Sequence, residues 1–90
     1  IDDLETSYYF RLNVVDMSGV LASITRVFGD LGISIASVIQ KDADRNVGTA
    51  ELVIITHPAK ELSIQKSSSL LANLDVVSEV NSIIRVEELS

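Results

Sequence analysis

The residues best suited to bind a ligand lie at one turn, between a segment that predicts a strand and one that predicts a helix. They are Asp16, Met17, Ser18, Gly19, Val20 and Leu21. The first turn of a helix leaves backbone N–H groups without partners, and such groups bind carboxylates well. Because glycine has no side chain, a ligand could approach the backbone closely at Gly19. An ordinary helix start with Ser18 as the N-cap explains the same residues without a ligand.

The remaining reactive side chains form no catalytic or metal-binding pattern. The single histidine, His57, has no cysteine or second histidine as a partner and stands before Pro58. Asp42 and Asp44 flank Ala43 without the EF-hand calcium-binding pattern, so they are typical of a solvated turn. The four glycines form neither a dinucleotide-binding fingerprint nor a P-loop. We therefore expect no cofactor, no metal ion and no catalysis by this chain.

Length and composition limit the kinds of partner and the cellular location that we expect for this chain. Ninety residues correspond to one domain with a modest core, and the absence of cysteine excludes disulfides as a supplement. Thirteen acidic against seven basic side chains give a net charge of -6, which disfavours nucleic acid as a partner. No apolar run approaches the roughly 20 residues that cross a bilayer, and the acidic start differs from a secretory signal. We expect a cytoplasmic domain over residues 8–90, preceded by a linker at residues 1–7 and excised from a longer protein.

Patterns of apolar residues predict six elements. Alternating or β-branched apolar residues predict strands at 8–15, 33–41, 47–56 and 76–87, and helical spacing appears at 20–31 and, less regularly, at 59–74. Gly32 is the predicted left-handed residue that ends the first helix. This order predicts an α+β, ferredoxin-like βαββαβ fold, with a four-stranded antiparallel sheet and two helices on one face.

The sheet face away from the helices is predicted to be apolar. Alternation places five side chains there: Tyr9, Val15, Val53, Ile55 and Ile83. A lone domain would expose polar residues on this face, so the set indicates a contact surface for another protein, and we expect self-association. A bulge that shifts a strand would instead send some of these residues into the core.

The turn at residues 16–21 resembles the one that marks the ACT domain family, in which Asp-x-x-Gly and Val-Leu follow the first strand. The segment Gly32-Ile33-Ser34-Ile35 resembles the Gly-Ile-x-Ile start of the family's second strand. The resemblance extends from Tyr8 to Glu87. Three strings are similar to the regulatory ACT domain of bacterial homoserine dehydrogenases: SIASVIQ at 34–40, AELVIITH at 50–57 and VNSIIRVE at 80–87.

The resemblance implies a feedback module that binds an amino acid, with threonine as the effector expected for a homoserine dehydrogenase. Because ACT domains pair side by side, it also implies a homodimer, with the effector between the first turn of one copy and the second strand of the other. The positions implied to surround the effector are Asp16, Met17, Gly19, Val20 and Leu21 from one copy and Ser34, Ile35 and Gln40 from its partner.

Two positions depart from the family pattern. Ser18 and Ser34 stand where the family often has proline and asparagine, and serine shortens the reach of hydrogen bonds at the site. A dimerisation module of a metabolic enzyme that has lost its ligand is therefore the alternative. An acylphosphatase-like enzyme is a further rival, but it would need an arginine in the first turn, which has none.

Overall fold

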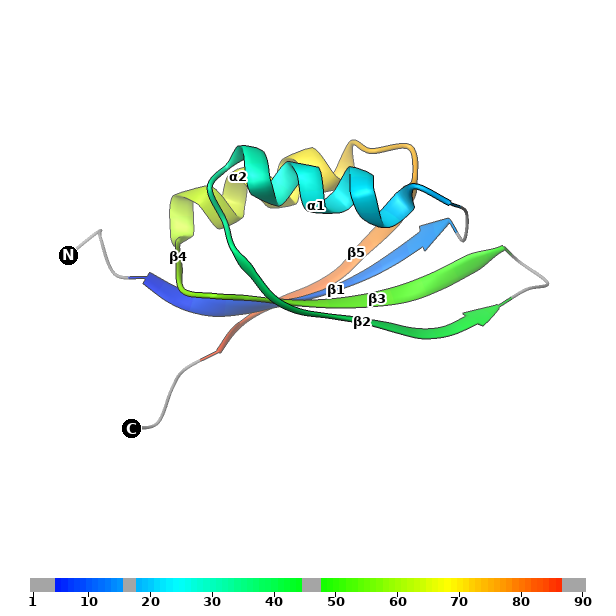
Figure 1. Ribbon diagram of the computed structural model, residues 1–90, viewed down its shortest axis with the longest axis horizontal. Helices are drawn as coiled ribbons and strands as arrows, with labels where there is room; N and C mark the ends of the chain where they lie inside the picture. The colour runs from blue at the N-terminus through cyan, green and yellow to red at the C-terminus, as the bar shows by residue number, and fades with distance from the viewer. Residues whose placement is uncertain (1–4, 16–17, 45–47, 87–90) are drawn as a thin grey trace.

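The computed structural model describes residues 5–15, 18–44 and 48–86 (Figure 1). Its elements are, in order, β1 (Glu5–Val15), α1 (Val20–Asp30), β2 (Ile35–Asp44), β3 (Thr49–Thr56), β4 (Ala59–Lys60), α2 (Glu61–Ala72) and β5 (Val77–Val86). The predicted βαββαβ order is confirmed, with one addition. β4 is a two-residue strand, which gives the sheet five strands instead of the predicted four.

The additional strand forms where the second helix was predicted to begin. β1 starts at Glu5, before the predicted strand, and its residues Glu5 and Thr6 pair with Lys60 and Ala59. The chain leaving Pro58 therefore finds backbone partners before it coils into α2, whose N-cap is Lys60 in an extended conformation. The early start of β1 carries no sequence signal, because residues 5–7 are polar.

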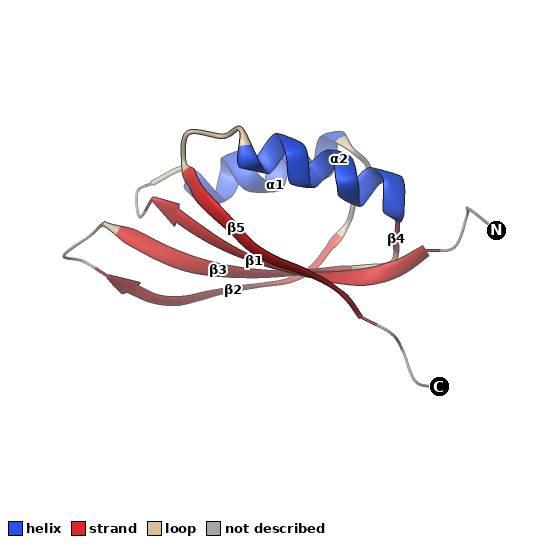
Figure 2. Ribbon diagram, turned by 180° about the vertical axis from the view of Figure 1, so that it is seen from behind, coloured by secondary structure: helices blue, strands red, loops and turns tan. Residues whose placement is uncertain are grey.

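β1 is the central strand of the sheet. It pairs antiparallel with β3 on one side and with β5 on the other, and β2 lies beyond β3 as an outer strand. Both helices lie on the same face of the sheet, which confirms the predicted layers (Figures 1 and 2). The end of the sheet where β2 meets β3 extends past the helices (Figure 1).

One hydrophobic core fills the space between the sheet and the helices. Alternate side chains of β1 are buried on the helix face, as predicted: Tyr8, Phe10, Leu12 and Val14. One stripe of α1 faces the sheet, at spacings of four, and consists of Val20, Ile24 and Phe28. Phe10 and Phe28 meet edge to face, with ring centroids 5.1 Å apart and ring planes at 87°.

α2 packs on the sheet despite its less regular apolar pattern. Its buried residues are Ile64, Ser67 and Leu71. The buried Ser67 hydroxyl donates a hydrogen bond to the Ile64 carbonyl oxygen at 2.7 Å, so burial does not leave it unpaired. Of the two described helices, neither has the length and apolar character needed to span a membrane.

Glycines set both ends of α1. Gly19 is the N-cap, with φ of +86°, and no side chain caps the helix, so the predicted cap by Ser18 is wrong. The left-handed conformation of Gly19 starts the helix one residue later, which takes Ser18 out of the capping position. Gly32 follows the helix with φ of +73°, which confirms the predicted terminator.

A β-bulge in β5 alters the predicted outer face. Arg11 pairs with Ser82 and Leu12 pairs with Val80, so Asn81 is an extra residue and the alternation shifts there.

Ile83, which was predicted to face away from the helices, lies opposite Phe10 and packs against the core, and that prediction is wrong. Ile84 takes its place opposite Tyr9. Ile55 also lies opposite Tyr9, in β3, and cross-strand partners share a face, so Ile55 faces outward as predicted.

Replacing Phe28 with alanine should lower the free energy of unfolding by about 3–5 kcal/mol, because it removes a fully buried ring and leaves a cavity beside Phe10. Urea denaturation followed by circular dichroism measures the change. Leu62→Ala, at a position 62% exposed, is the matched control and should cost far less. Equal losses for the two variants would contradict this assignment of the core.

Two glycine substitutions near α1 should have opposite effects on stability. Gly29→Ala should raise the free energy of unfolding by about 0.5–1 kcal/mol, since Gly29 lies inside the helix with open space around an added Cβ. Gly19→Ala should lower it by about 1–2 kcal/mol, because φ of +86° is costly for alanine even though an added Cβ meets nothing within 4 Å. Thermal unfolding of both variants tests this, and a shift of the same sign in both would refute it.

Candidate functional site

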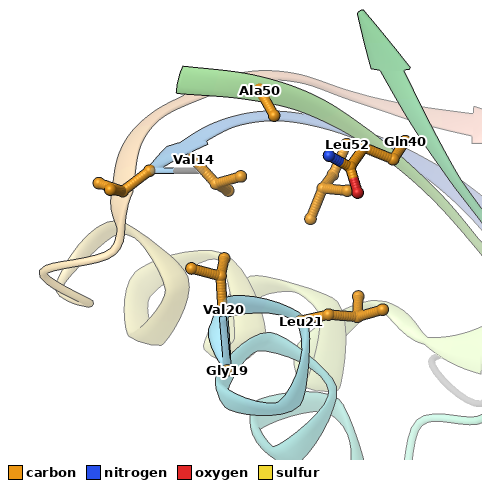
Figure 3. A pocket seen from close by; sticks show the side chains of 8 residues that line it. Val14, Gly19, Val20, Leu21, Gln40, Ala50 and Leu52 are labelled. Atoms are coloured by element: carbon orange, nitrogen blue, oxygen red, sulfur yellow. The ribbon is translucent and has the colours of Figure 1, made fainter. Parts of the chain in front are cut away.

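A pocket lies between the start of α1 and the helix-covered face of the sheet (Figure 3). Its volume of about 120 Å³ corresponds to roughly four water molecules, which is room for a short side chain. The lining residues come from β1, the start of α1, β2 and β3, and are Val14, Val15, Gly19, Val20, Leu21, Gln40, Ala50 and Leu52.

Strand register brings the sheet side of the pocket together. Val14 of β1 pairs with Ala50 of β3, and Leu52 of β3 pairs with Gln40 of β2. Val14 and Leu52 are core residues on the helix face, and their cross-strand partners share that face. Gln40 nevertheless stays exposed, because it belongs to β2, the outer strand of the sheet.

The helix side of the pocket is built by the first turn of α1. Figure 3 shows Val20 pointing from α1 towards the sheet, and the Gln40 amide lying across the space from Leu21. An added Cβ on Gly19 would meet nothing within 4 Å, so the backbone of this turn is open to a ligand. Glycine is favoured at this position because it adopts the left-handed conformation without strain.

The polar groups at the pocket are few and have defined roles. The Ser23 N–H donates to the Gly19 carbonyl oxygen at 3.1 Å, so the N–H groups of the three residues before Ser23 have no acceptor within α1. The first turn carries no acidic side chain that would compete for them. Together with the positive end of the helix dipole, these groups favour an anion such as a carboxylate. The Gln40 amide can both donate and accept a hydrogen bond, and the side chains around it are aliphatic.

The structure brings together four of the nine residues predicted for the site: Gly19, Val20, Leu21 and Gln40. Asp16 and Met17 lie outside the described residues. Ser18 is exposed next to the pocket without lining it.

Ser34 and Ile35 are also absent from the pocket lining. Ser34 directly precedes β2 and Ile35 is its first residue, whereas Gln40 lies in the middle of the strand. The five steps along the strand from Ile35 to Gln40 span roughly 17 Å. Gln40, expected to approach from a partner, lines the pocket of its own chain.

Four lining residues were missed by sequence reasoning. Val14 and Val15 directly precede the turn, so their position in the sequence could have suggested them. Ala50 and Leu52 lie far from the turn in the sequence, and only the register between β1, β3 and β2 reveals them.

The described residues hold no group of three or more His, Cys, Asp or Glu side chains arranged for a metal ion. His57 is exposed just after β3, outside the pocket lining.

The chain is similar in sequence to part of several known homoserine dehydrogenases. It is 37% identical over 90 residues to the homoserine dehydrogenase of Methylobacillus glycogenes, covering 100% of this chain and 22% of that protein. It is 39% identical over 88 residues to that of Mycobacterium tuberculosis, covering 93% of this chain and 20% of that protein. The chain therefore spans about a fifth of the length of the curated relatives it matches.

Solved structures show the same fold. A homoserine dehydrogenase from Thiobacillus denitrificans superposes with a TM-score of 0.85 at 31% identity, covering 99% of this chain and 19% of that chain. The ACT domain from the GTP pyrophosphokinase of Chlorobium tepidum superposes with a TM-score of 0.67 at 15% identity, covering 91% of this chain and 99% of that chain. The family model for the ACT domain matches residues 8–76, the larger part of the chain. With the element order described above, this match shows that the chain belongs to the ACT domain family.

Proposed function

We propose that this chain is the regulatory domain of a homoserine dehydrogenase, and that it binds threonine as a feedback effector in the pocket between α1 and the sheet. The observation that carries the proposal is that three features surround one small pocket. They are the free N–H groups at the start of α1, the aliphatic side chains of the sheet and the side-chain amide of Gln40. Catalysis would belong to the rest of the parent enzyme, a cytoplasmic protein, and this domain, over residues 8–90, would carry the control.

The carboxylate, the methyl group and the hydroxyl of threonine each suit a group that the pocket offers. The carboxylate suits the N–H groups at the start of α1. The threonine methyl group suits the aliphatic side chains of Val14 and Leu52, and the hydroxyl suits the Gln40 amide. Asp16, outside the described residues, is the proposed acceptor for the ammonium group.

The pocket also lies at a free edge of the sheet. Within the described residues, β2 pairs with β3 alone, so its other edge has backbone groups available to a second copy. We propose a homodimer formed side by side along this edge. Because Gln40 belongs to β2, a ligand bound in the pocket would then lie next to the dimer interface.

The first test separates threonine from its isostere valine. Wild-type protein should bind threonine more tightly, because the Gln40 amide can pair with the hydroxyl, and Gln40→Leu should reduce threonine affinity about tenfold while leaving valine affinity nearly unchanged. Isothermal titration calorimetry measures both. Gln65→Leu, an exposed glutamine of α2, is the matched control. If no amino acid binds the wild type, the chain is a dimerisation module without a ligand.

The second test concerns linkage between binding and association. A ligand in the pocket that also contacts the second copy at this interface stabilises the assembled state, by up to about 2.7 kcal/mol at 100 times its dissociation constant. Sedimentation velocity should therefore show threonine shifting the wild-type chain towards a larger assembly than it forms without threonine. Asp16→Ala should weaken this shift. A wild-type assembly state that threonine does not change would refute the proposed linkage.

A further inference from the structure

The face of the sheet opposite the helices is covered by no described element (Figures 1 and 2). Its central part, here called the outer face, consists of three rows of cross-strand neighbours. From β2 to β5, the first row is Ser37, Ile55, Tyr9 and Ile84, the second is Ile39, Val53, Arg11 and Ser82, and the third is Lys41, Glu51, Asn13 and Glu79. Two rows are therefore rich in apolar side chains and the third is charged or polar.

The apolar residues of the outer face are exposed at its sides and buried in its middle. Ile39 is 47% exposed and Ile84 is 55% exposed, although both are large and apolar. Val53, between Ile39 and Arg11 in the second row, is only 2% exposed without any helix above it. A patch of this kind on a small domain indicates a protein contact.

The charges on the outer face point to a second copy of the chain as the partner. The whole chain carries a net charge of -6, which opposes association of two copies. The outer face instead balances Arg11 and Lys41 against Glu51 and Glu79. It is therefore a surface on which two acidic copies can meet with little repulsion.

We propose that the outer faces of two copies pack together in a symmetric dimer whose two-fold axis runs parallel to the strands, between β1 and β3. This axis places β2 of one copy on β5 of the other and β3 on β1, without shifting any residue along the strand direction. Each row of one copy therefore packs on the same row of the other copy, with the order of its residues reversed. Lys41 of one copy then lies opposite Glu79 of the other, twice per dimer. In the first row, the apolar Ile55 lies opposite Tyr9, and Ile84 lies opposite Ser37.

The other simple two-fold axis, perpendicular to the strands, does not fit. It would place the first row on the third, with Ile55 against Glu51 and Ile84 against Glu79, so that carboxylates would lose water without a cationic partner. Both axes keep the aligned packing usual for two sheets stacked about 10 Å apart, so the contacts between the rows decide between them.

This interface is separate from side-by-side pairing along β2. Glu79 and Ile84 belong to β5, at the opposite side of the sheet, so a dimer formed through two β2 edges would not bring Glu79 to Lys41. Outer-face pairing also needs no effector. A chain that used both surfaces would assemble into dimers of dimers.

Charge reversal tests the proposal by sedimentation velocity of the 90-residue chain without added amino acids. The wild type should form a closed dimer as its concentration rises. Lys41→Glu and Glu79→Lys should each weaken the dimer about tenfold, because each makes two exposed ion pairs repulsive. The double variant should regain most of the lost affinity. Glu79→Lys lowers the net negative charge, so weakening by this variant cannot arise from overall repulsion.

Two further variants complete the test. Lys66→Glu changes the net charge by the same amount as Lys41→Glu, but at an exposed position of α2, on the other side of the sheet. It should leave the dimer unchanged. Ile84→Thr removes apolar area from the outer face while keeping a β-branched residue in the strand, and should weaken the dimer. Wild-type protein that stays monomeric, a double variant without recovery, or open polymers, which would indicate pairing of β2 with β5, would each overturn the proposal.

Discussion

The contact between Phe10 and Phe28 determines where α1 lies on the sheet, and the pocket depends on that placement. Phe10 belongs to the central strand, which is held by β3 and β5 on its two sides, so the ring that receives Phe28 has a fixed position. Both rings are fully buried and meet edge to face. Val20 is buried on the same stripe of α1, about two helical turns before Phe28. The first turn of α1 is therefore held close to Val14.

The fold could be predicted because β1 and α1 each bury one regular stripe of apolar residues. The alternation in β1 and the spacing in α1 give the core directly, and Gly32 marks the end of α1. What the sequence could not reveal depends on pairing. Polar residues at the start of β1 become a strand because the segment after Pro58 pairs with them, and the extra Asn81 in β5 turns Ile83 inward.

The candidate site likewise contains residues that could be predicted from the sequence and residues that could not. The turn around Gly19 and the glutamine of β2 could be proposed from the sequence, by their resemblance to a family. Ala50 and Leu52 could not, because they join the pocket only through the register that β3 shares with β1 and β2. The distance between Ser34 and Gln40 along β2 likewise separates two residues that the sequence alone groups together. Gln40 and Lys41 show the converse, since adjacent residues of one strand face opposite sides and belong to different proposed surfaces.

β1 also connects the end of the sheet that carries the pocket with the end from which α2 begins. Its 11 residues, at about 3.4 Å each, form a strand on the order of 35 Å long. Pairing with β3 on one side and β5 on the other limits the bending of this strand. At the pocket end, the Val15 N–H is tied to the Val76 carbonyl oxygen at 2.8 Å. At the far end, Glu5 and Thr6 are tied to β4, which leads directly into α2. One continuous strand therefore connects the pocket with the start of α2.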